Sequence, residues 1–327
     1  MTVEMMSRQD NDQAHGRGKA SRIHRFGGPE VIMLEDVIPP EPGDGEVLVR
    51  VKAAGVGPWD AWIRAGRSAL PQPLPLTLGS DIPGIVETAG PGVTELVPGD
   101  AVFGVTNPRF TGGYADYAIA SAAMLTKKPA MLSHVDAASV PVVAVTAWQA
   151  LFEQAQLTRG QSVLIHGAAG NVGAFAVQLA HRAGLRVHAT ASRRDLDYVR
   201  GLGADTVLDG HTARFEEDLP SVDAVIDLVG GALQTRAFAV LNKGGALIST
   251  VSAPDRDKAA ANGVRAAFLL VEVTTERLAR IAAMIEQAAL ATAVGMILPL
   301  ADATLAHEML EGMRPRPRGK IVLRVSE

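Results

Sequence analysis

The residues with the clearest chemical meaning lie between Ala168 and Gly173, where the sequence follows the pattern A-x-G-x-x-G. An apolar segment, residues 162–166, precedes this pattern, and a helical pattern follows it. Glycines in such a turn let the backbone approach a diphosphate closely, and the start of the following helix favours its negative charge. The same glycines could serve only for close packing of a helix on a strand. Because the order of strand, turn and helix fits a dinucleotide site, we expect cofactor contacts at Ala168, Ala169, Gly170, Asn171, Val172 and Gly173.

The end of the next expected strand indicates which dinucleotide is bound. An NAD site would carry Asp or Glu about 20 residues beyond the fingerprint, to hold the ribose 2′-hydroxyl. This chain has Ser192, Arg193 and Arg194 in that region. A hydroxyl and two guanidinium groups suit a 2′-phosphate, so we expect NADP(H) as the cofactor. Ser192 and Asp195 also fit a helix capping box, and both interpretations can hold together.

The composition is that of an ordinary globular protein, and it excludes several kinds of chemistry. Of the 327 residues, 47% are hydrophobic and 20% are charged, with a formal net charge of -4, so we expect no nucleic-acid partner. The chain has no cysteine, which excludes disulfides, thiolate nucleophiles and cysteine-ligated zinc. None of the eight histidines clusters at ligand spacing, so we expect no metal site.

Signals for membrane insertion and export are not found in the sequence. No apolar run approaches the roughly 18 residues of a membrane span. The first residues mix charges with Asn, Gln, Gly and His and lack an apolar signal-peptide core. We therefore expect a cytoplasmic protein in which residues 1–19 form a disordered extension.

The elements that must position these residues predict an α/β protein with two domains. From about residue 20 to 130, short alternating strands between Pro and Gly turns predict a β-rich domain. Strands and helices alternate over 131–273, which predicts a doubly wound parallel sheet of the Rossmann type. Residues 274–327 lack this rhythm and are expected to return to the first domain. Strands are expected at 162–166, 186–190, 206–208, 224–227, 246–250 and 267–273, and helices at 140–156, 172–182, 196–202 and 233–241.

An ordered series of short motifs carries a resemblance to a known family. The motifs lie at 53–60, 78–86, 97–104, 112–117, 146–151, 168–173, 202–205, 225–231 and 319–323. With this series the chain resembles the zinc-free quinone oxidoreductase branch of the medium-chain dehydrogenase/reductase superfamily, which includes ζ-crystallin-like proteins and alkenal/enone reductases. The resemblance covers nearly everything from Ile23 to Val325. It implies a GroES-like catalytic domain, completed by the C-terminal segment, around a Rossmann domain, with the active site in the cleft between them.

Two departures from the family pattern bear on the chemistry. Zinc-dependent relatives carry Gly-His-Glu where this chain has Gly79, Ser80 and Asp81, so zinc is not expected as a Lewis acid. Relatives often show the motif Asn-Pro-x-Asp, and at the corresponding positions, 57–60, this chain has Gly57 and Pro58 as the first two residues. A donor near the nicotinamide is therefore missing, and backbone or water would have to replace it.

The resemblance implies further site residues. Trp62 falls where relatives carry an aromatic residue, and it could either wall the substrate pocket or pack in the core. Thr146 resembles a family threonine near the nicotinamide, and it could also be a helix N-cap. Lys320 could contact the cofactor or lie in solvent. Trp62 and Thr146 are thus the expected catalytic residues, and the remaining expected cofactor contacts are Gly57, Pro58, Thr146, Val229, Val251 and Lys320.

Other polar residues are expected to have structural roles. Asp60 and Arg64 are four residues apart on an expected helical turn, which favours an ion pair over acid–base catalysis. His166, at the end of a strand, is expected to pack in the core. Asp227 is expected to shape the turn at 229–231.

The resemblance implies hydride transfer from NADPH to a quinone or to an α,β-unsaturated carbonyl compound, that is, an enone or alkenal. The nucleotide carries the chemistry, while the protein orients the reactants. Two other functions stay open: an enoyl-thioester reductase, and an NADPH-binding, crystallin-like protein with little turnover. Because relatives pair their last Rossmann strands edge to edge, we expect a homodimer through the strand edge at 266–273.

Overall fold

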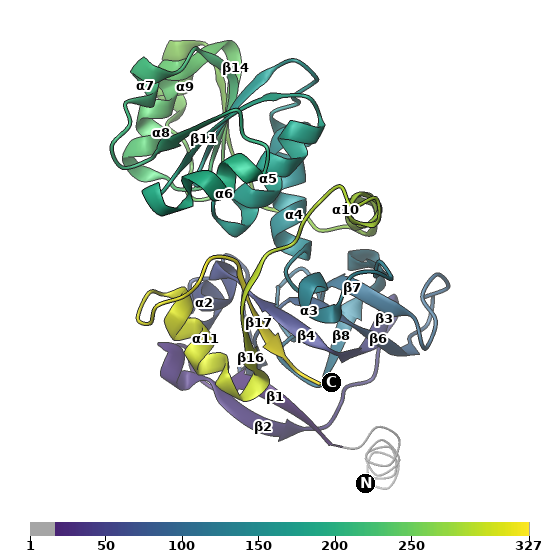
Figure 1. Cartoon of the computed structure of the whole chain (residues 1–327). Coiled ribbons are helices and arrows are strands. Elements are labelled where there is room, and N and C mark those ends of the chain that lie inside the picture. Colours follow the sequence, from purple (N-terminus) through teal and green to yellow (C-terminus); the bar gives the residue numbers. More distant parts are fainter. Residues whose placement is uncertain (1–16, 327) are drawn as a thin grey trace, which may run out of the picture. The chain divides into compact units, whose positions relative to one another are not determined.

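The chain folds into two compact units (Figure 1). The computed structural model describes residues 17–326. One unit comprises Met1–Val142, Val273–Glu286 and Ala291–Glu327, and we call it the β unit. The other comprises Val143–Glu272 and Gln287–Leu290, and we call it the α/β unit.

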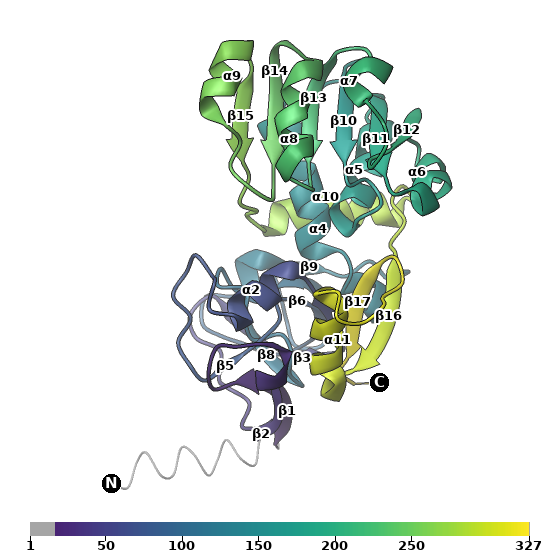
Figure 2. The ribbon, with the colours of Figure 1, turned by 90° about the vertical axis from the view of Figure 1, so that its left-hand side faces the viewer.

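The α/β unit is built on one parallel sheet with the strand order β12-β11-β10-β13-β14-β15. Figure 2 shows this sheet with β15 at one edge and β12 at the other. Its central strand β10 is buried along its whole length, which explains the continuous apolar run in the sequence. The strands are β10 (Ser162–His166), β11 (Arg186–Ala191), β12 (Thr206–Asp209), β13 (Val222–Asp227), β14 (Leu241–Ser249) and β15 (Arg265–Phe268).

Helices cover both faces of this sheet. On one face lie α5 (Asn171–Arg182) and α6 (Leu196–Gly201), and on the other lie α8 (Gly231–Ala237) and α9 (Arg256–Asn262), as Figure 1 shows. The short helix α7 (Phe215–Asp218) shares a core cluster with α8 and α9. A parallel sheet between two helical layers is the doubly wound α/β arrangement, and this prediction is confirmed.

The strand order reverses beside β10, which pairs with β11 on one side and with β13 on the other. In such sheets, ligands bind outside the carboxyl ends of the strands at the point of reversal. His166 and Asp227 are the last residues of β10 and β13, and they are direct neighbours in the register. The segments that follow these two strands therefore start side by side.

The β unit contains a mostly antiparallel sheet that the C-terminal segment extends. Its main path is β16-β17-β4-β6-β3-β8, and β7 pairs with β6 and β9. Strand β17 (Lys320–Arg324) is antiparallel to β4 (Ala53–Val56), so the end of the chain returns to this unit. The other strands of this sheet are β3 (Glu46–Val51), β6 (Asp81–Ala89), β7 (Ala101–Val105), β8 (Tyr117–Ser121), β9 (Leu125–Lys127) and β16 (Val294–Pro299).

A smaller sheet and several helices complete the β unit. The small sheet has the order β2-β1-β5, from β1 (Gly18–Ile23), β2 (Met33–Val37) and β5 (Leu76–Thr77). Residues far apart in the sequence, such as Ile23 and Ile321, belong to the same hydrophobic cluster of the β unit. The helices are α2 (Pro58–Arg64), α3 (His134–Ala137), α10 (Thr275–Glu286) and α11 (Ala303–Leu310).

The expected disordered extension, residues 1–19, lies mostly outside the described residues. For its last part the expectation is wrong, because Gly18 and Lys19 begin strand β1 and pair with β2. The N–H of Lys19 also donates to the carboxylate of Asp116 (2.7 Å). These hydrogen bonds order a stretch whose composition alone suggests no structure.

Two element boundaries also differ from the expectation. The strand expected at 267–273 is β15, and it ends at Phe268 because its partner β14 ends opposite, at Ser249. The helix expected over 140–156 is α4 (Pro141–Trp148), which continues as a π-helical stretch over Gln149–Gln154.

Candidate functional site

The turn after β10 has the backbone geometry of an anion-binding loop. Gly167 has a φ of 74°, in the left-handed region that glycine adopts without strain. Ala168 N donates to Thr190 O (3.0 Å) and Gly170 N to Gly167 O (3.0 Å), which fixes the loop. Gly170 is the N-cap of α5, which begins at Asn171. Since the first N–H groups of a helix have no intrahelical partner, those of α5 can bind a diphosphate, and the residues present fit a dinucleotide.

The two fingerprint glycines differ in what requires them. A Cβ atom at Gly173 would lie 2.4 Å from Gly167 O and 2.6 Å from Ala168 Cα, so this position allows no side chain. At Gly170 the nearest atom, also Gly167 O, would be 3.2 Å away. Close packing of helix on strand therefore explains Gly173, whereas the more open side of Gly170 leaves room for a ligand to approach.

Asp227 organises the turn that follows β13. Its Oδ1 accepts hydrogen bonds from Val229 N (3.1 Å) and Gly230 N (2.8 Å). Its Oδ2 accepts from Gln234 Nε2 (2.9 Å) and Ser249 Oγ (2.9 Å). The buried carboxylate thus ties the end of β13 to α8 and β14, and its expected role in shaping this turn is confirmed.

The turns after β10, β13 and β14 lie together. A Cβ atom at Gly167 would be 2.9 Å from Val229 Cγ2, and one at Gly230 would be 3.4 Å from Val251 Cγ1. Both valines are among the exposed large hydrophobic residues. The structure therefore brings Val229 and Val251 next to the fingerprint as accessible apolar groups. Their contact with the cofactor stays a prediction.

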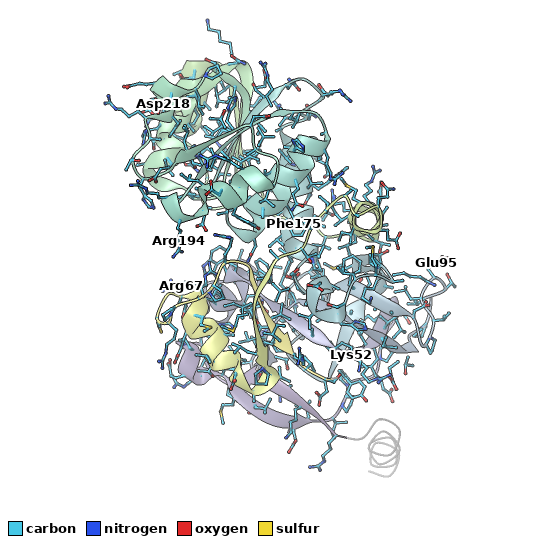
Figure 3. All side chains as sticks on the ribbon, viewed as in Figure 1. Lys52, Arg67, Glu95, Phe175, Arg194 and Asp218 are labelled. Carbon is cyan, nitrogen blue, oxygen red and sulfur yellow. The ribbon has the colours of Figure 1, made fainter. Side chains whose placement is uncertain are left out.

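The segment after β11 presents two arginines to solvent. Arg193 and Arg194 are both exposed, and Arg194 projects from the surface of the α/β unit (Figure 3). The Ser192 hydroxyl donates to the Asp195 carboxylate and caps no backbone N–H, so the capping-box interpretation is wrong. Arg194 Nε lies 3.6 Å from Asp195 Oδ2. Both guanidinium groups are thus accessible to an anionic ligand.

Thr146 and His166 are both buried in the α/β unit. Thr146 is the sixth residue of α4, so it is not the N-cap of this helix. His166 Nδ1 lies 3.0 Å from Thr190 Oγ1, and its ring packs edge-on against Phe215. Burial lowers the pKa of His166 to about 4, so it is neutral at physiological pH. Its expected packing role is confirmed, and it is not a general acid at neutral pH.

In the β unit, Lys320, an expected cofactor contact, forms a buried ion pair with Asp81. Lys320 Nζ lies 2.8 Å from Asp81 Oδ2, and the two side chains are 1% and 0% exposed. Asp81 Oδ1 accepts a further hydrogen bond from Val142 N (3.1 Å). The alternative interpretation, in which Lys320 lies in solvent, is wrong. The ammonium group of Lys320 is paired with Asp81 inside the β unit. Its contact with the cofactor stays a prediction.

Asp60 forms a second buried acidic site near this pair. Its Oδ2 accepts hydrogen bonds from Gly57 N (2.8 Å) and Tyr114 Oη (3.0 Å). Its Oδ1 has no partner among the described residues. Burial raises the pKa of Asp60 to about 7, against the opposing effects of the Gly57 N–H and the charge of Lys320. Burial raises the pKa of Asp81 as well.

The predicted ion pair between Asp60 and Arg64 is wrong. The Arg64 side chain instead extends towards α11, where Nη2 pairs with Glu311 Oε1 (2.8 Å) and Nη1 lies 3.0 Å from His307 Nδ1. Its Nε donates to Gly27 O (3.1 Å). Burial lowers the pKa of His307 to about 3, so its neutral ring accepts from the guanidinium. Asp60 and Arg64 diverge because each finds buried partners on a different element.

Trp59, which the sequence did not single out, covers the ion pair. Its ring centroid lies 4.5 Å from Lys320 Nζ, and its Nε1 donates to Ser80 Oγ (3.0 Å). A Cβ atom at Gly57 would lie 2.3 Å from Trp59 Cζ2, so the indole fills the space beside this glycine. One feature of the sequence could have indicated this position of the indole: a glycine stands in place of the asparagine of relatives, and a large aromatic residue follows two positions later.

Trp62 lies on the same short helix α2, three residues after Trp59. It is 51% exposed, whereas Asp60, Ala61 and Ile63 are buried. The expectation that Trp62 packs in the core is therefore wrong, and its role as a wall of the substrate pocket stays a prediction.

Two further properties follow from residues 17–326. Within this range, no three His, Cys, Asp or Glu side chains are grouped in a way that could hold a metal ion. None of the helices described there has both the length and the apolar character needed to cross a membrane.

Comparisons with known proteins agree on both units. Residues 43–130 match the family described as alcohol dehydrogenase GroES-like domain, and residues 202–323 match the family described as zinc-binding dehydrogenase. The quinone oxidoreductase of Homo sapiens is 31% identical over 307 residues, which cover 89% of this chain and 93% of that protein.

Solved structures give the same result over nearly the whole chain. A quinone oxidoreductase from Coxiella burnetii superposes with a TM-score of 0.88 at 35% identity. The superposition covers 95% of this chain and 100% of that protein. A mycobacterial protein in complex with NADPH superposes with a TM-score of 0.84 at 31% identity, covering 94% and 100% of the two chains.

Proposed function

Because this chain belongs to the medium-chain dehydrogenase/reductase superfamily and has quinone oxidoreductases as relatives, we propose that it transfers hydride from NADPH to a quinone or an α,β-unsaturated carbonyl compound, without a metal ion. The observation that carries the proposal is the fingerprint turn at Gly167–Gly173 beside two exposed arginines at the end of the neighbouring strand. This combination supports a pyridine dinucleotide with a 2′-phosphate.

The choice of NADPH over NADH is supported by charge. No acidic side chain stands directly at the end of β11 to accept the ribose 2′-hydroxyl, since the strand is followed by Ser192, Arg193 and Arg194. A guanidinium group forms paired, charge-assisted hydrogen bonds with phosphate oxygens. The relative solved with NADPH supports the same choice.

The cofactor, when bound, supplies the hydride. The N–H groups at the start of α5 would hold the diphosphate, and Arg193 and Arg194 would hold the 2′-phosphate. Val229 and Val251 offer apolar surface to the bound nucleotide. Thr146, Gly57 and Pro58 remain the residues proposed near the nicotinamide. The protein contributes orientation and electrostatics rather than an acid or base of its own, and solvent can provide the proton.

A metal-independent reaction is supported by the partners of residues 79–81. Ser80 accepts a hydrogen bond from Trp59, and Asp81 is paired with Lys320. The ammonium group of Lys320 already neutralises the carboxylate of Asp81, the one carboxylate in this segment. Asp81 therefore takes part in an internal ion pair and is not available to bind a metal ion. The chain also offers no thiolate ligand, because it has no cysteine.

The proposal also includes self-association. Strand β15 is an edge of the parallel sheet; its last residue, Phe268, is 43% exposed, and Leu270, two residues further on, is 71% exposed. An apolar sheet edge favours pairing with a second copy, so we propose a homodimer through β15 and the residues that follow it. The cytoplasmic location expected from the sequence stays a prediction.

The decisive experiment follows NADPH oxidation with four acceptors: 1,4-benzoquinone, 9,10-phenanthrenequinone, an alkenal and crotonyl-CoA. We expect turnover with the quinones or the alkenal. Turnover with crotonyl-CoA alone would identify an enoyl-thioester reductase. Tight NADPH binding without turnover on any acceptor would identify a binding protein. If titration shows no binding of NADPH or NADH, the proposed function is wrong.

A further inference from the structure

We propose that Asp60 is a positioning residue of the reductase. From inside the β unit it fixes the backbone of Gly57 and Pro58, the two residues of this unit's first helical turn that are proposed near the nicotinamide, and thereby sets where the reacting ring lies. This inference rests on the proposed function, and it adds a residue that acts on the cofactor only through its neighbours.

Asp60 binds both backbone hydrogen-bonding groups of Gly57. The Gly57 N–H donates to Asp60 Oδ2 (2.8 Å), and the Asp60 N–H donates to Gly57 O (3.0 Å). Pro58 has a φ that its ring fixes, and it has no N–H to donate. Because Gly57 is buried and Pro58 is exposed, the accessible residue at the start of this turn is Pro58, and Asp60 determines its position.

The same hydrogen bonds limit which donor can replace the asparagine of relatives. The sequence left two possibilities at this position, the backbone and water. The Gly57 N–H is already bound to Asp60 and Pro58 has no N–H, so neither residue can donate to the carboxamide of a nicotinamide. Without that donor, the placement of the ring depends on the shape of the turn, and Asp60 fixes this shape.

Asp60 is itself held in one orientation. Tyr114 Oη donates to the same Oδ2 atom (3.0 Å), and both side chains are 0% exposed. The Tyr114 ring packs edge-on against the buried ring of His307, with the centroids 6.0 Å apart. Because close-packed buried groups have no space to turn, the carboxylate can pass a fixed position on to Gly57.

The carboxyl group of Asp60 has a cost for folding. It is completely buried, and its Oδ1 atom has no hydrogen-bond partner among the described residues. A buried polar atom without a partner destabilises the folded state, because it has lost its hydration. Such a group calls for an explanation outside folding, and the hold on Gly57 provides one.

The ionisation of Asp60 should change how firmly it holds the turn. The titratable groups that face it are Lys320 on β17, Asp81 on β6, and Tyr114 between β7 and β8. Burial raises the pKa of Asp60 to about 7, against the Gly57 hydrogen bond and the charge of Lys320, while the charge of Asp81 adds to the rise. The carboxylate that forms above this pH accepts a charge-assisted hydrogen bond, which is stronger than the bond to a neutral acid. The kcat of the wild type is therefore expected to rise between about pH 6 and pH 8.

A matched control exists in the same unit. Val97-Pro98-Gly99-Asp100 repeats the spacing of Gly57-Pro58-Trp59-Asp60, with proline second and aspartate fourth. It also repeats the hydrogen bonds, since Val97 N donates to Asp100 Oδ2 (3.0 Å) and Asp100 N donates to Val97 O (3.0 Å). Asp100→Ala therefore removes the same type of contact from a turn that is not proposed to meet the cofactor.

The test measures kcat with 9,10-phenanthrenequinone in the variants Asp60→Ala, Asp60→Asn and Asp100→Ala. In Asp60→Ala we expect kcat to fall about tenfold or more, because small displacements of the reacting atoms slow the chemical step strongly. Asp60→Asn keeps an acceptor oxygen, so it should restore most of kcat and remove the rise with pH. Asp100→Ala should match the wild type.

Two further readouts distinguish positioning from a purely structural role. The primary kinetic isotope effect with 4-deuterated NADPH should be larger in Asp60→Ala than in the wild type, because hydride transfer becomes slower relative to the other steps. The fluorescence of bound NADPH, which reports the surroundings of the nicotinamide, should also change. The Kd of NADPH should stay within about twofold, because the fingerprint turn that holds the diphosphate is unaltered.

Each outcome decides for or against the inference. An unchanged kcat and isotope effect in Asp60→Ala would show that Asp60 does not position the cofactor, and so would a loss that Asp60→Asn fails to restore. Thermal unfolding shows whether each variant is folded. If Asp60→Ala is not, Tyr114→Phe, which removes one donor to Oδ2, should lower kcat by a smaller factor, and an unchanged kcat there overturns the inference.

The failure of the proposed function would look different. If the wild type binds NADPH but turns over no acceptor, the proposed function is wrong, and the fluorescence of NADPH bound to wild type and Asp60→Asn or Asp60→Ala alone decides whether Asp60 positions the ring. If the wild type binds neither NADPH nor NADH, both proposals are wrong.

Discussion

Asp81 and Lys320, which are 239 residues apart in the chain, form an ion pair with an Nζ–Oδ2 distance of 2.8 Å. Asp81 is the first residue of β6 and Lys320 the first of β17, so the pair links the C-terminal return of the chain to the centre of the β unit. Both side chains are buried, and each charge depends on the other for compensation.

Removing the lysine should strongly destabilise the protein. In Lys320→Met, the Asp81 carboxylate loses its partner while it stays buried, and we expect a loss of about 3–5 kcal/mol in the free energy of unfolding. Urea denaturation followed by circular dichroism measures this loss. The double variant Asp81→Asn, Lys320→Met should recover part of it, because no unpaired charge remains. Lys19→Met, which breaks an exposed pair with Asp36, should cost less than about 1 kcal/mol.

Asp60 should make stability depend on pH. Burial raises its pKa from 3.8 to about 7, so between these values the folded protein binds more protons than the unfolded chain. Stability contributed by this group is therefore present below about pH 4 and is lost as the pH rises to about 7. One pKa unit corresponds to about 1.4 kcal/mol, so Asp60→Asn should gain roughly 4 kcal/mol relative to the wild type over this range.

The measurement is urea denaturation of both proteins at about pH 4.5, 6 and 7.5. Asp81, whose pKa burial also raises, is present in both proteins, so the difference between the curves reports Asp60 together with its charge interaction with Asp81. A difference that does not vary with pH would show that Asp60 titrates near its ordinary value.

The two kinds of glycine environment predict different outcomes for alanine substitution. In Gly173→Ala, the new Cβ would collide with the backbone at Gly167 and Ala168, so helix α5 must move and both NADPH affinity and stability should fall. We expect at least a tenfold rise in the NADPH Kd, because the diphosphate contacts depend on the start of this helix. Gly201→Ala is the matched control, since nothing lies within 4 Å of its added Cβ atom. An unchanged Kd in Gly173→Ala would mean that the nucleotide binds elsewhere.

The arginines after β11 should determine the choice of cofactor. Arg193→Ala combined with Arg194→Ala removes two contacts to the 2′-phosphate, so we expect the KM for NADPH to rise about tenfold or more while the KM for NADH changes little. Arg200→Ala, on the adjacent helix α6, removes an exposed arginine that pairs with Asp197 and serves as the control. Equal effects on both cofactors would contradict a phosphate-binding role.

The edge of the parallel sheet predicts the oligomeric state. Light scattering should give about twice the chain mass of 34.2 kDa. Phe268→Lys places a charge on the proposed interface and should shift the equilibrium towards the monomer. Particles of 34.2 kDa alone, at all concentrations of the wild type, would contradict the dimer.

The sequence predicted best what depends on local order. The strand Ser162–His166 and the helix from Asn171 lie within one residue of their expected positions, because an apolar run and a glycine turn specify both locally. Strand β15 is shorter than expected because its length depends on its partner, which the local pattern does not reveal.

The polar groups inside the β unit could not be predicted for the same reason. The pair of Asp81 with Lys320 joins distant parts of the chain, and Arg64 finds its partners on α11 rather than on its own helix. The spacing of Asp60 and Arg64 described helix geometry correctly, but it could not show which buried groups compete for each side chain. The resemblance drew attention to Trp62, where relatives carry an aromatic residue, whereas nothing in the local sequence pattern indicated that Trp59 would cover the ion pair.

The contact between Gly57 and the indole of Trp59 limits the order in which these two positions can change. A larger residue at position 57 would have to displace the ring, so an asparagine there requires either a shift of the indole or a smaller residue in place of the tryptophan. The effects of substitutions at the two positions should therefore depend on one another, and an asparagine at position 57 should be tolerated better once a smaller residue has replaced the tryptophan.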